Sequence, residues 1–524
     1  MQQETLETHA PQPGTGVHSR RILFFFHSLG YLRFFDSVIR LLLERGHEVH
    51  LMIERDNHEP NEAGWLAEMV ERPGFSSSVT TSLVTDRWRT VATKLRRSSD
   101  YLRFLGPGFR DTPYYVSRAR GRTPKPFLRL VDARPFRGER GRTLLLRALL
   151  LLERAVPSSD PLERELKEHA PDVLVVSPHL MPGGLHSEYI KSARAVGIPT
   201  CVCIASWDNL SSKQLLREIP DRVVVWNETQ REEAEAIHGV PPDRIVITGA
   251  QCFDLWFEWQ PRPREEFARR VGLDPGRPYV LYLGGSLFPG ALTEAEYVRD
   301  RWIPALRRTP GLADLGVLVR PHPSRMPEWS SSGLEQLEGV AMWPRGGDEM
   351  PVDRLARADY FDSIHWSDAV VGLNTSAMIE AAIVGRSVLT FLVPEFSESQ
   401  AGTFHFDYLL TVGGGLPRFA PSLDIHLEQL RATVAGGDTE ASERNRRFIE
   451  AFVRPHGLGQ AATPLLADAI EELAADVSAE PRRSMDWRLL PVRAALAGYI
   501  YVKAARWKLA RRFAKDRTAT SQTL

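Results

Sequence analysis

The sequence predicts an α/β protein with two Rossmann-like domains, each a doubly wound parallel sheet, that face one another across a cleft and precede a basic helical tail. Three observations lead to this prediction. Short apolar runs alternate with helical periodicity, this alternation occurs twice, and the 524 residues exceed the roughly 100 to 200 of one domain. A cleft between two such domains is a natural ligand site.

The first domain opens with an apolar run at 21–26, helical periodicity that ends near Gly46, and a second apolar run at 48–53. This order predicts a β-α-β unit. Another helix is expected after Asn227, whose side chain is a good N-cap. Later in the domain, a helix is predicted at 189–196 and strands at 172–177, 200–205, 222–225 and 245–248.

The second domain repeats the pattern after a proline-rich stretch. Its strands are predicted at 279–283, 317–320, 369–372 and 387–391. The predicted divisions are a disordered N-terminus at 1–17, a first domain at 18–258 with an Arg-rich insertion at 86–147, a linker at 259–276, a second domain at 277–475 and the basic tail at 481–524.

Composition excludes several classes of protein. With 43% hydrophobic and 25% charged residues, the chain is neither a disordered protein nor a multi-span membrane protein. Its N-terminus lacks a signal-like apolar region, and no apolar run approaches the ~20 residues of a spanning helix. The three cysteines have no zinc-site spacing and indicate a reducing compartment; Cys201 and Cys203 are expected to be core residues. We therefore expect a cytoplasmic protein.

Charge is distributed unevenly, although 66 basic residues balance 66 acidic ones and no nucleic-acid partner is expected. Residues 86–147 carry 17 Arg and Lys against 5 Asp and Glu, and residues 481–524 carry 11 against 2. The two segments favour contact with a polyanion or an anionic membrane. The alternative is that the arginines lie on ordinary solvated surface and have no partner. In the tail the cations alternate with aromatic residues, as in an interfacial helix: Trp487, Tyr499, Tyr501 and Trp507.

Two strand ends of the second domain carry candidate phosphate-binding groups. Gly284, Gly285 and Ser286 follow one strand, and glycines there let backbone amides approach a phosphate. A simple tight turn is the alternative. Arg320 and His322 follow the next strand in Arg-Pro-His-Pro, where the prolines hold the backbone. The alternative for this pair is a rigid strand exit with solvated side chains.

The segment 370–382 gives the strongest prediction. A strand ends in small polar residues, Asn374, Thr375 and Ser376, before a helix opens, and a diphosphate is expected at the amides of the helix start. Glu380 lies one turn beyond Ser376 and is expected to accept hydrogen bonds from a ribose diol. A capping-box role for Glu380 does not fit the spacing.

A general base is harder to place. His27, at the end of the first strand, is the first candidate, and Asp208, in the loop after the strand at 200–205, is the second. A structural histidine and an Asx turn are the respective alternatives. Trp207 and Asn209 in the same loop are the candidate acceptor-binding residues. Weaker catalytic candidates are His179, and His405 with Asp407.

No metal or other cofactor is expected. The sequence contains no Asp-x-Asp, no HExxH and no Walker A motif. The charge of a leaving group would then be met by Arg320, the amides of the helix start and His322.

Four segments resemble the GT-B superfamily of glycosyltransferases, in particular bacterial capsule and surface-polysaccharide transferases and relatives of CDP-glycerol glycerophosphotransferases. They are FFFHSLG, ITGAQCFD, RPHP and SDAVVGLNTSAMIEAAIVGRSV. The resemblance implies that the second domain binds the nucleotide of an activated donor through Gly285, Arg320, His322, Ser376 and Glu380. It places the acceptor on the first domain, where the insertion is longer than a minimal domain of this type requires.

The sequence therefore predicts a metal-independent glycosyltransferase that moves a sugar from a nucleotide-activated donor to a hydroxyl of a surface-glycan or lipid-linked acceptor. It is expected at the inner face of the cell membrane, with peripheral contact to anionic lipid. On the same fold, the alternatives are a CDP-glycerol glycerophosphotransferase and a UDP-sugar epimerase. An alternative of another class is a non-catalytic basic adaptor for membranes or polyanions.

Overall fold

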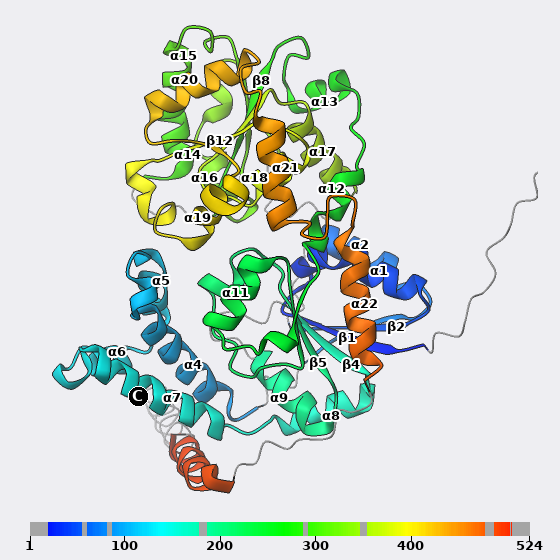
Figure 1. The fold of residues 1–524 in the computed structure, drawn as a ribbon, viewed down its shortest axis with the longest axis vertical. Coiled ribbons are helices and arrows are strands. Elements are labelled where there is room, and N and C mark those ends of the chain that lie inside the picture. The colour runs from blue at the N-terminus through cyan, green and yellow to red at the C-terminus, as the bar shows by residue number, and fades with distance from the viewer. Residues whose placement is uncertain are drawn as a thin grey trace, which may run out of the picture.

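The computed structural model describes residues 19–54, 60–80, 86–177, 186–286, 292–345, 354–476, 487–503 and 505. Two parallel sheets, each flanked by helices, form two domains (Figure 1). The fold class predicted from the sequence is confirmed. Within the described ranges, no helix is both long enough and apolar enough to cross a bilayer.

The first sheet has seven parallel strands in the order β3-β2-β1-β4-β5-β6-β7. Alternate residues of β1 pack on opposite faces: Phe24 and Phe26 in one core, Leu23 and Phe25 in the other. This explains the continuous apolar run in the sequence. The strands are β1 (Arg21–Phe26), β2 (Glu48–Ile53), β3 (Phe75–Val79), β4 (Val173–Ser177), β5 (Thr200–Cys203), β6 (Arg222–Val225) and β7 (Ile245–Ile247).

Helices cover both faces of this sheet. One face packs against α1 (Asp36–Glu44), α2 (Pro60–Val70) and α22 (Ala462–Ala474). The other packs against α8 (Asp160–His169), α9 (His186–Val196), α10 (Asn209–Ser212) and α11 (Glu228–Ala236). As predicted, Asn227 caps α11: its side-chain oxygen accepts a hydrogen bond from the Gln230 amide at 3.0 Å.

The second sheet has six parallel strands in the order β10-β9-β8-β11-β12-β13. They are β8 (Tyr279–Leu283), β9 (Gly316–Arg320), β10 (Val340–Met342), β11 (Ala369–Gly372), β12 (Val388–Phe391) and β13 (Arg418–Ala420). One face packs against α14 (Glu294–Tyr297), α15 (Ile303–Arg308), α16 (Met326–Ser330) and α20 (Leu423–Val434). The other contacts α12 (Asp254–Glu258), α13 (Arg264–Val271), α17 (Arg354–His365), α18 (Ala377–Ile383), α19 (Phe404–Thr411) and α21 (Ala441–Phe452).

The strand order reverses beside β1 in the first sheet and beside β8 in the second, because each has its next strand in sequence on one side and a later strand on the other. In open α/β sheets, ligands bind outside the carboxyl ends of the strands at such switch points.

Two helices lie differently from the predicted division of the chain. Helix α13 falls within the predicted linker, but its Phe267 and Val271 are buried in the core of the second domain. Helix α22 lies within the range predicted for the second domain but packs on the first: Leu466 and Ile470 lie in the core of the first domain, and Asp468 pairs with Arg45 at 2.7 Å. Periodicity shows that a helix exists but not which sheet it covers.

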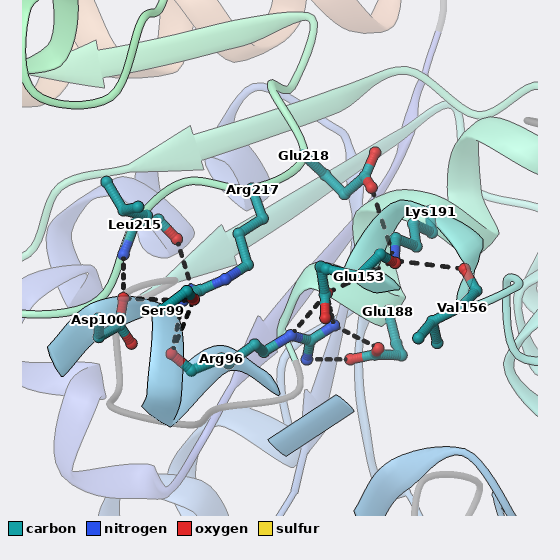
Figure 2. Close-up of polar contacts among 10 residues, drawn as sticks. All are labelled: Arg96, Ser99, Asp100, Glu153, Val156, Glu188, Lys191, Leu215, Arg217 and Glu218. Atoms are coloured by element: carbon teal, nitrogen blue, oxygen red, sulfur yellow. Dashed lines mark hydrogen bonds and ion pairs between the residues drawn. The ribbon is translucent and has the colours of Figure 1, made fainter. Parts of the chain in front are cut away.

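The Arg-rich insertion folds as four helices between β3 and β4: α4 (Arg89–Phe104), α5 (Pro113–Arg122), α6 (Lys125–Val131) and α7 (Glu139–Ala155). A buried ion network attaches it to the first domain (Figure 2). The Arg96 guanidinium contacts the carboxylate of Glu153 on α7 at 2.7 Å and that of Glu188 on α9 at 2.6 Å. Part of the insertion's positive charge therefore lies inside the protein.

Residues 490–503 of the predicted tail form a helix, called the tail helix below. In Figure 1 it lies beside α7, at the end of the first domain remote from the second domain. The predicted disordered N-terminus, His179 and Trp507 lie outside the described residues.

Candidate functional site

A cavity of about 380 Å³ lies between the two domains, at the carboxyl ends of their strands. Both domains line it. Arg33, Tyr360 and several aromatic side chains contribute to its lining. The structure also brings seven residues predicted from the sequence to this cavity: Trp207, Gly284, Arg320, His322, Thr375, Ser376 and Glu380.

Glu380 lies in the first turn of α18 and is half-buried at the cavity wall. Its carboxylate accepts a hydrogen bond from the Tyr360 hydroxyl on α17. Burial raises the pKa of Glu380 to about 7, while the Tyr360 hydrogen bond and the charges of Arg33 and Arg320 oppose this rise. This carboxylate therefore titrates near neutral pH within reach of two cations.

Arg320 ends β9 and supplies the cation of the second domain. Its guanidinium lies 4.1 Å from the centre of the Tyr360 ring, a cation–π contact. Its Nη1 is buried and has no hydrogen-bond partner among the described residues. Burial lowers the pKa of Arg320, and Tyr360, Asp359 and Glu380 oppose the effect. A buried donor without a partner at a cavity wall is suited to an anionic ligand.

Arg33 supplies a second cation, which was not predicted from the sequence. It lies in the short 3-10 helix Leu29–Phe34 that follows β1, with its guanidinium 4.4 Å from the centre of the Phe34 ring. Burial lowers its pKa, and Glu380 is the strongest opposing charge. Arg33 and Glu380 therefore interact across the domain boundary. In the sequence, only the position of Arg33 just after the FFFHSLG segment could have indicated a role in the site.

His322 is held as a neutral hydrogen-bond donor. Its Nδ1 accepts a hydrogen bond from the Ser324 amide at 3.2 Å, which assigns the ring proton to Nε2. Burial and the charges of Arg33 and Arg325 lower the pKa of His322 to about 4. At neutral pH this ring offers an N–H without a positive charge.

The glycine turn after β8 differs from its predicted role. A Cβ at Gly284 would lie 2.9 Å from the Trp329 ring and 3.1 Å from the backbone nitrogen of His322, so this position has no room for a side chain. The amide of Gly285 donates to Glu294 at 2.8 Å and is not free for a phosphate, contrary to expectation. Ser286 is exposed and is not among the residues that line the cavity.

The start of α18 also differs from expectation. Asn374 is buried, and its side-chain amide donates to the Ser399 carbonyl at 2.7 Å and the His405 ring at 3.1 Å. It supports the loop and does not line the cavity. The amides of Met378 and Ile379 bond to carbonyls of the same turn, at 3.2 Å and 2.9 Å. At the helix start, Thr375, Ser376 and Ala377 line the cavity, and the first two bring hydroxyl groups to it.

His27 lies outside the residues that line the cavity, in a cluster at the carboxyl ends of β1 and β2. Its Nδ1 is 2.7 Å from a carboxylate oxygen of Glu54. Burial favours a higher pKa for Glu54, but the hydrogen bond with His27 and the neighbouring His186 hold it below its usual value. Ligand atoms of His27, Glu54 and His186 lie within 4.8 Å of one another, so these residues are also able to hold a metal ion.

The loop after β5 is held by its own side chains. The Asp208 carboxylate contacts the Lys213 ammonium at 2.9 Å and accepts from the Ser206 hydroxyl at 2.9 Å. Despite burial, Lys213 and His405 hold the pKa of Asp208 well below its usual range. The Asn209 side-chain oxygen accepts from the Ala205 and Ser206 amides, at 3.2 Å each. Both therefore act as turn-forming residues, and an Asp208 base is not favoured.

His405 is buried where the insertion meets the second domain. Its Nδ1 is 3.3 Å from the Tyr115 hydroxyl of α5, and its ring packs edge-on against Trp207 at 5.0 Å. Its neighbour Asp407 is exposed. Cys201 and Cys203 are buried in the first core, which confirms their predicted packing role.

No protein-family model and no curated protein matches this chain. Among solved structures, a glycosyltransferase from Rickettsia africae aligns with a TM-score of 0.50 and 10% identity, over 87% of this chain and 99% of that one. A UDP-GlcNAc 2-epimerase from Neisseria meningitidis, bound to UDP-GlcNAc, has a TM-score of 0.48 and 10% identity, over 86% and 100%. At such identities the likeness concerns the fold alone. The two parallel-sheet domains facing an interdomain cavity are the GT-B fold.

Proposed function

We propose that this protein is a glycosyltransferase that moves a sugar from a nucleotide-activated donor to a hydroxyl of a surface-glycan or lipid-linked acceptor. One observation carries the proposal: Arg33 and Arg320, from opposite domains, converge with the carboxylate of Glu380 on a single interdomain cavity. We propose a cytoplasmic location at the inner membrane face.

The cavity suits a nucleoside diphosphate group. Two guanidinium groups offset the negative charge of the diphosphate, and the N–H of His322 and the hydroxyls of Thr375 and Ser376 add neutral donors. Glu380 accepts hydrogen bonds from the ribose diol. Because protein cations meet the leaving-group charge, we propose that no metal ion is needed at the diphosphate.

We propose the His27–Glu54 pair as the general base. The Glu54 carboxylate accepts a hydrogen bond from the Nδ1–H of His27, so Nε2 carries no proton and can take that of the acceptor hydroxyl. The acceptor oxygen then bonds to the anomeric carbon as the bond to the diphosphate oxygen breaks. The nucleoside diphosphate leaves with its charge stabilised by Arg33 and Arg320.

The test measures nucleotide release from a panel of nucleotide sugars and CDP-glycerol, with and without EDTA. We expect release from one nucleotide sugar, insensitive to EDTA, and strongly weakened donor binding in R33A, R320A and E380A. The exposed Arg308 provides the matched control R308A, which should behave as the wild type.

Other outcomes contradict parts of the proposal. Release of CMP from CDP-glycerol would make the protein a glycerophosphotransferase, and conversion of a UDP-sugar without an acceptor would make it an epimerase. Loss of activity in EDTA would disprove metal independence. If the protein binds no nucleotide at all, the alternative of a non-catalytic basic adaptor for membranes or polyanions would be favoured.

A further inference from the structure

The tail helix packs on the end of α7 and on the start of the insertion, although the contacting residues Ala155 and Arg493 are 338 positions apart in sequence. Leu496, Ala497 and Ile500 contact a small core formed by Trp88, Ala92 and Val156. The Arg493 guanidinium also donates to the Ala155 carbonyl at 3.0 Å. The structure therefore joins the two basic segments into one region of the molecule (Figure 1).

The opposite face of the tail helix, with the turn that precedes it, is apolar and exposed. Trp487 is 71% exposed and Tyr501 is 77% exposed, and Leu490, Tyr499 and Val502 are also exposed. A helix with apolar residues on both faces is normally covered on both. Among the described residues, only the face of this helix toward the insertion is covered.

Helix α7 adds a second exposed stripe. Arg140, Leu144, Arg147, Leu151 and Arg154 are all exposed, and their spacing of four, three, four and three residues places them along one face. Cations and leucines alternate along this stripe, in contrast to the purely charged face of an ordinary surface helix.

The surrounding surface is strongly cationic. Of the fourteen large hydrophobic side chains exposed in the described parts of the chain, eight lie in residues 86–155 or 487–502. Acidic side chains exposed in 86–155 are few: Asp111, Asp132 and Glu139. The exposed cations there are Arg87, Lys94, Arg97, Arg110, Arg120, Arg122, Lys125, Arg129, Arg134, Arg137, Arg140, Arg147 and Arg154.

We propose that the tail helix, residues 487–489 and the exposed stripe of α7 form one membrane-docking surface for an anionic lipid bilayer. This deepens the proposed function, because a lipid-linked acceptor would be met on that bilayer. Exposed tryptophan and tyrosine are suited to the headgroup region, and the cations are attracted to anionic lipid. A soluble polyanion would leave the aromatic face without a partner. A symmetric dimer through this surface would bring like charges together.

The experiment is flotation of the full-length protein with vesicles of phosphatidylcholine, with or without phosphatidylglycerol. We expect binding only to the anionic vesicles, and loss of it in salt of about 0.5 M, which screens the charges. R140Q/R147Q/R154Q should weaken binding by roughly tenfold or more. W487S/Y501S should also weaken vesicle binding. Because both side chains are exposed, their replacement should have little effect on folding.

Matched controls lie on the second domain. R269Q/R308Q/R431Q removes three exposed cations, and L355S/I425S removes two exposed apolar side chains. Both should bind vesicles as the wild type does, as should E380A, so a failed donor site and a failed docking surface are separable. The proposal is overturned if the protein does not bind anionic vesicles, or if the controls lose as much binding as the test variants. It is also overturned if the protein is a dimer that W487S/Y501S converts to monomers.

Discussion

The hydroxyl of Tyr360 donates a hydrogen bond to the carboxylate of Glu380, and the face of the same tyrosine ring packs against the guanidinium of Arg320. One side chain from α17 thus positions both a cation and a carboxylate of the proposed donor site. Tyr360 is a positioning residue, and its removal should affect both neighbours.

Tyr360→Phe tests this arrangement. It keeps the ring under Arg320 but removes the hydrogen bond that lowers the pKa of Glu380, so this pKa should rise above about 7. At pH 7 more of the carboxyl is then protonated, and donor affinity should fall about fivefold, the value of one hydrogen bond of ~1 kcal/mol. Calorimetric titration from pH 6 to 9 should show the midpoint moving upward. An unchanged midpoint would disprove the coupling.

Glu380→Gln should stabilise the ligand-free protein at high pH. Burial raises the pKa of Glu380 to about 7, so ionisation in the folded state costs free energy that the unfolded chain does not incur. This destabilisation is absent below the ordinary glutamate pKa and complete above pH 7. The melting temperature of the variant should exceed that of the wild type at pH 8 and match it near pH 4. Donor binding should be lost at the same time.

Gly284→Ala should reduce both stability and donor affinity. The added Cβ meets the Trp329 ring at 2.9 Å and the backbone nitrogen of His322 at 3.1 Å, so the surrounding atoms must move. We expect a loss of about 1–3 kcal/mol in the free energy of unfolding, typical of overpacking. Urea denaturation measures it. Gly108→Ala, where the added Cβ meets no atom within 4 Å, is the control and should be nearly neutral.

His27→Ala should lower the rate of transfer without changing donor affinity. His27 does not line the cavity, and the proposed base acts on the acceptor hydroxyl. We expect kcat to fall by about 10²–10⁴. Glu54→Gln, which keeps a hydrogen-bond partner but loses the charge, should cause a smaller loss. A matching fall in donor affinity measured by calorimetry would place His27 in the donor site.

Arg96→Met should destabilise the attachment of the insertion. It removes the Arg96 cation from the buried carboxylates of Glu153 and Glu188 (Figure 2), which leaves Glu153 only Lys191 at 3.6 Å, and such a loss costs about 3–5 kcal/mol. The triple variant R96M/E153Q/E188Q removes the charges together and should recover much of the stability in urea denaturation. If the single variant is as stable as the wild type, this network does not hold the insertion.

Much of the fold followed from local patterns. Apolar runs such as Arg21–Phe26 are buried on both faces and therefore predict parallel strands whatever lies around them. Because the carboxyl ends of such strands meet at one edge, Arg320, His322 and Glu380 were expected together, and they line one cavity. In addition, the spacing of Glu380 from the helix start does not fit a capping box, which favoured a role in ligand binding.

Other features depended on contacts distant in sequence. Arg33 became a candidate only because the first domain places it beside Glu380, and Gly285 and Asn374 were excluded by partners on other elements. Similarly, no local signal distinguishes Arg96, which is fully buried, from the exposed arginines around it.

The sequence by itself determined two parallel sheets, the edge at which their ligand would bind and the uneven charge of the chain, because these follow from residue type and short-range periodicity. Only the tertiary structure decided that α22 covers the first sheet, that the insertion and the tail share one surface, and which polar groups reach the cavity. The physical reason is that hydrogen bonds and ion pairs are satisfied by whichever partner folding brings near, and sequence spacing does not contain that information.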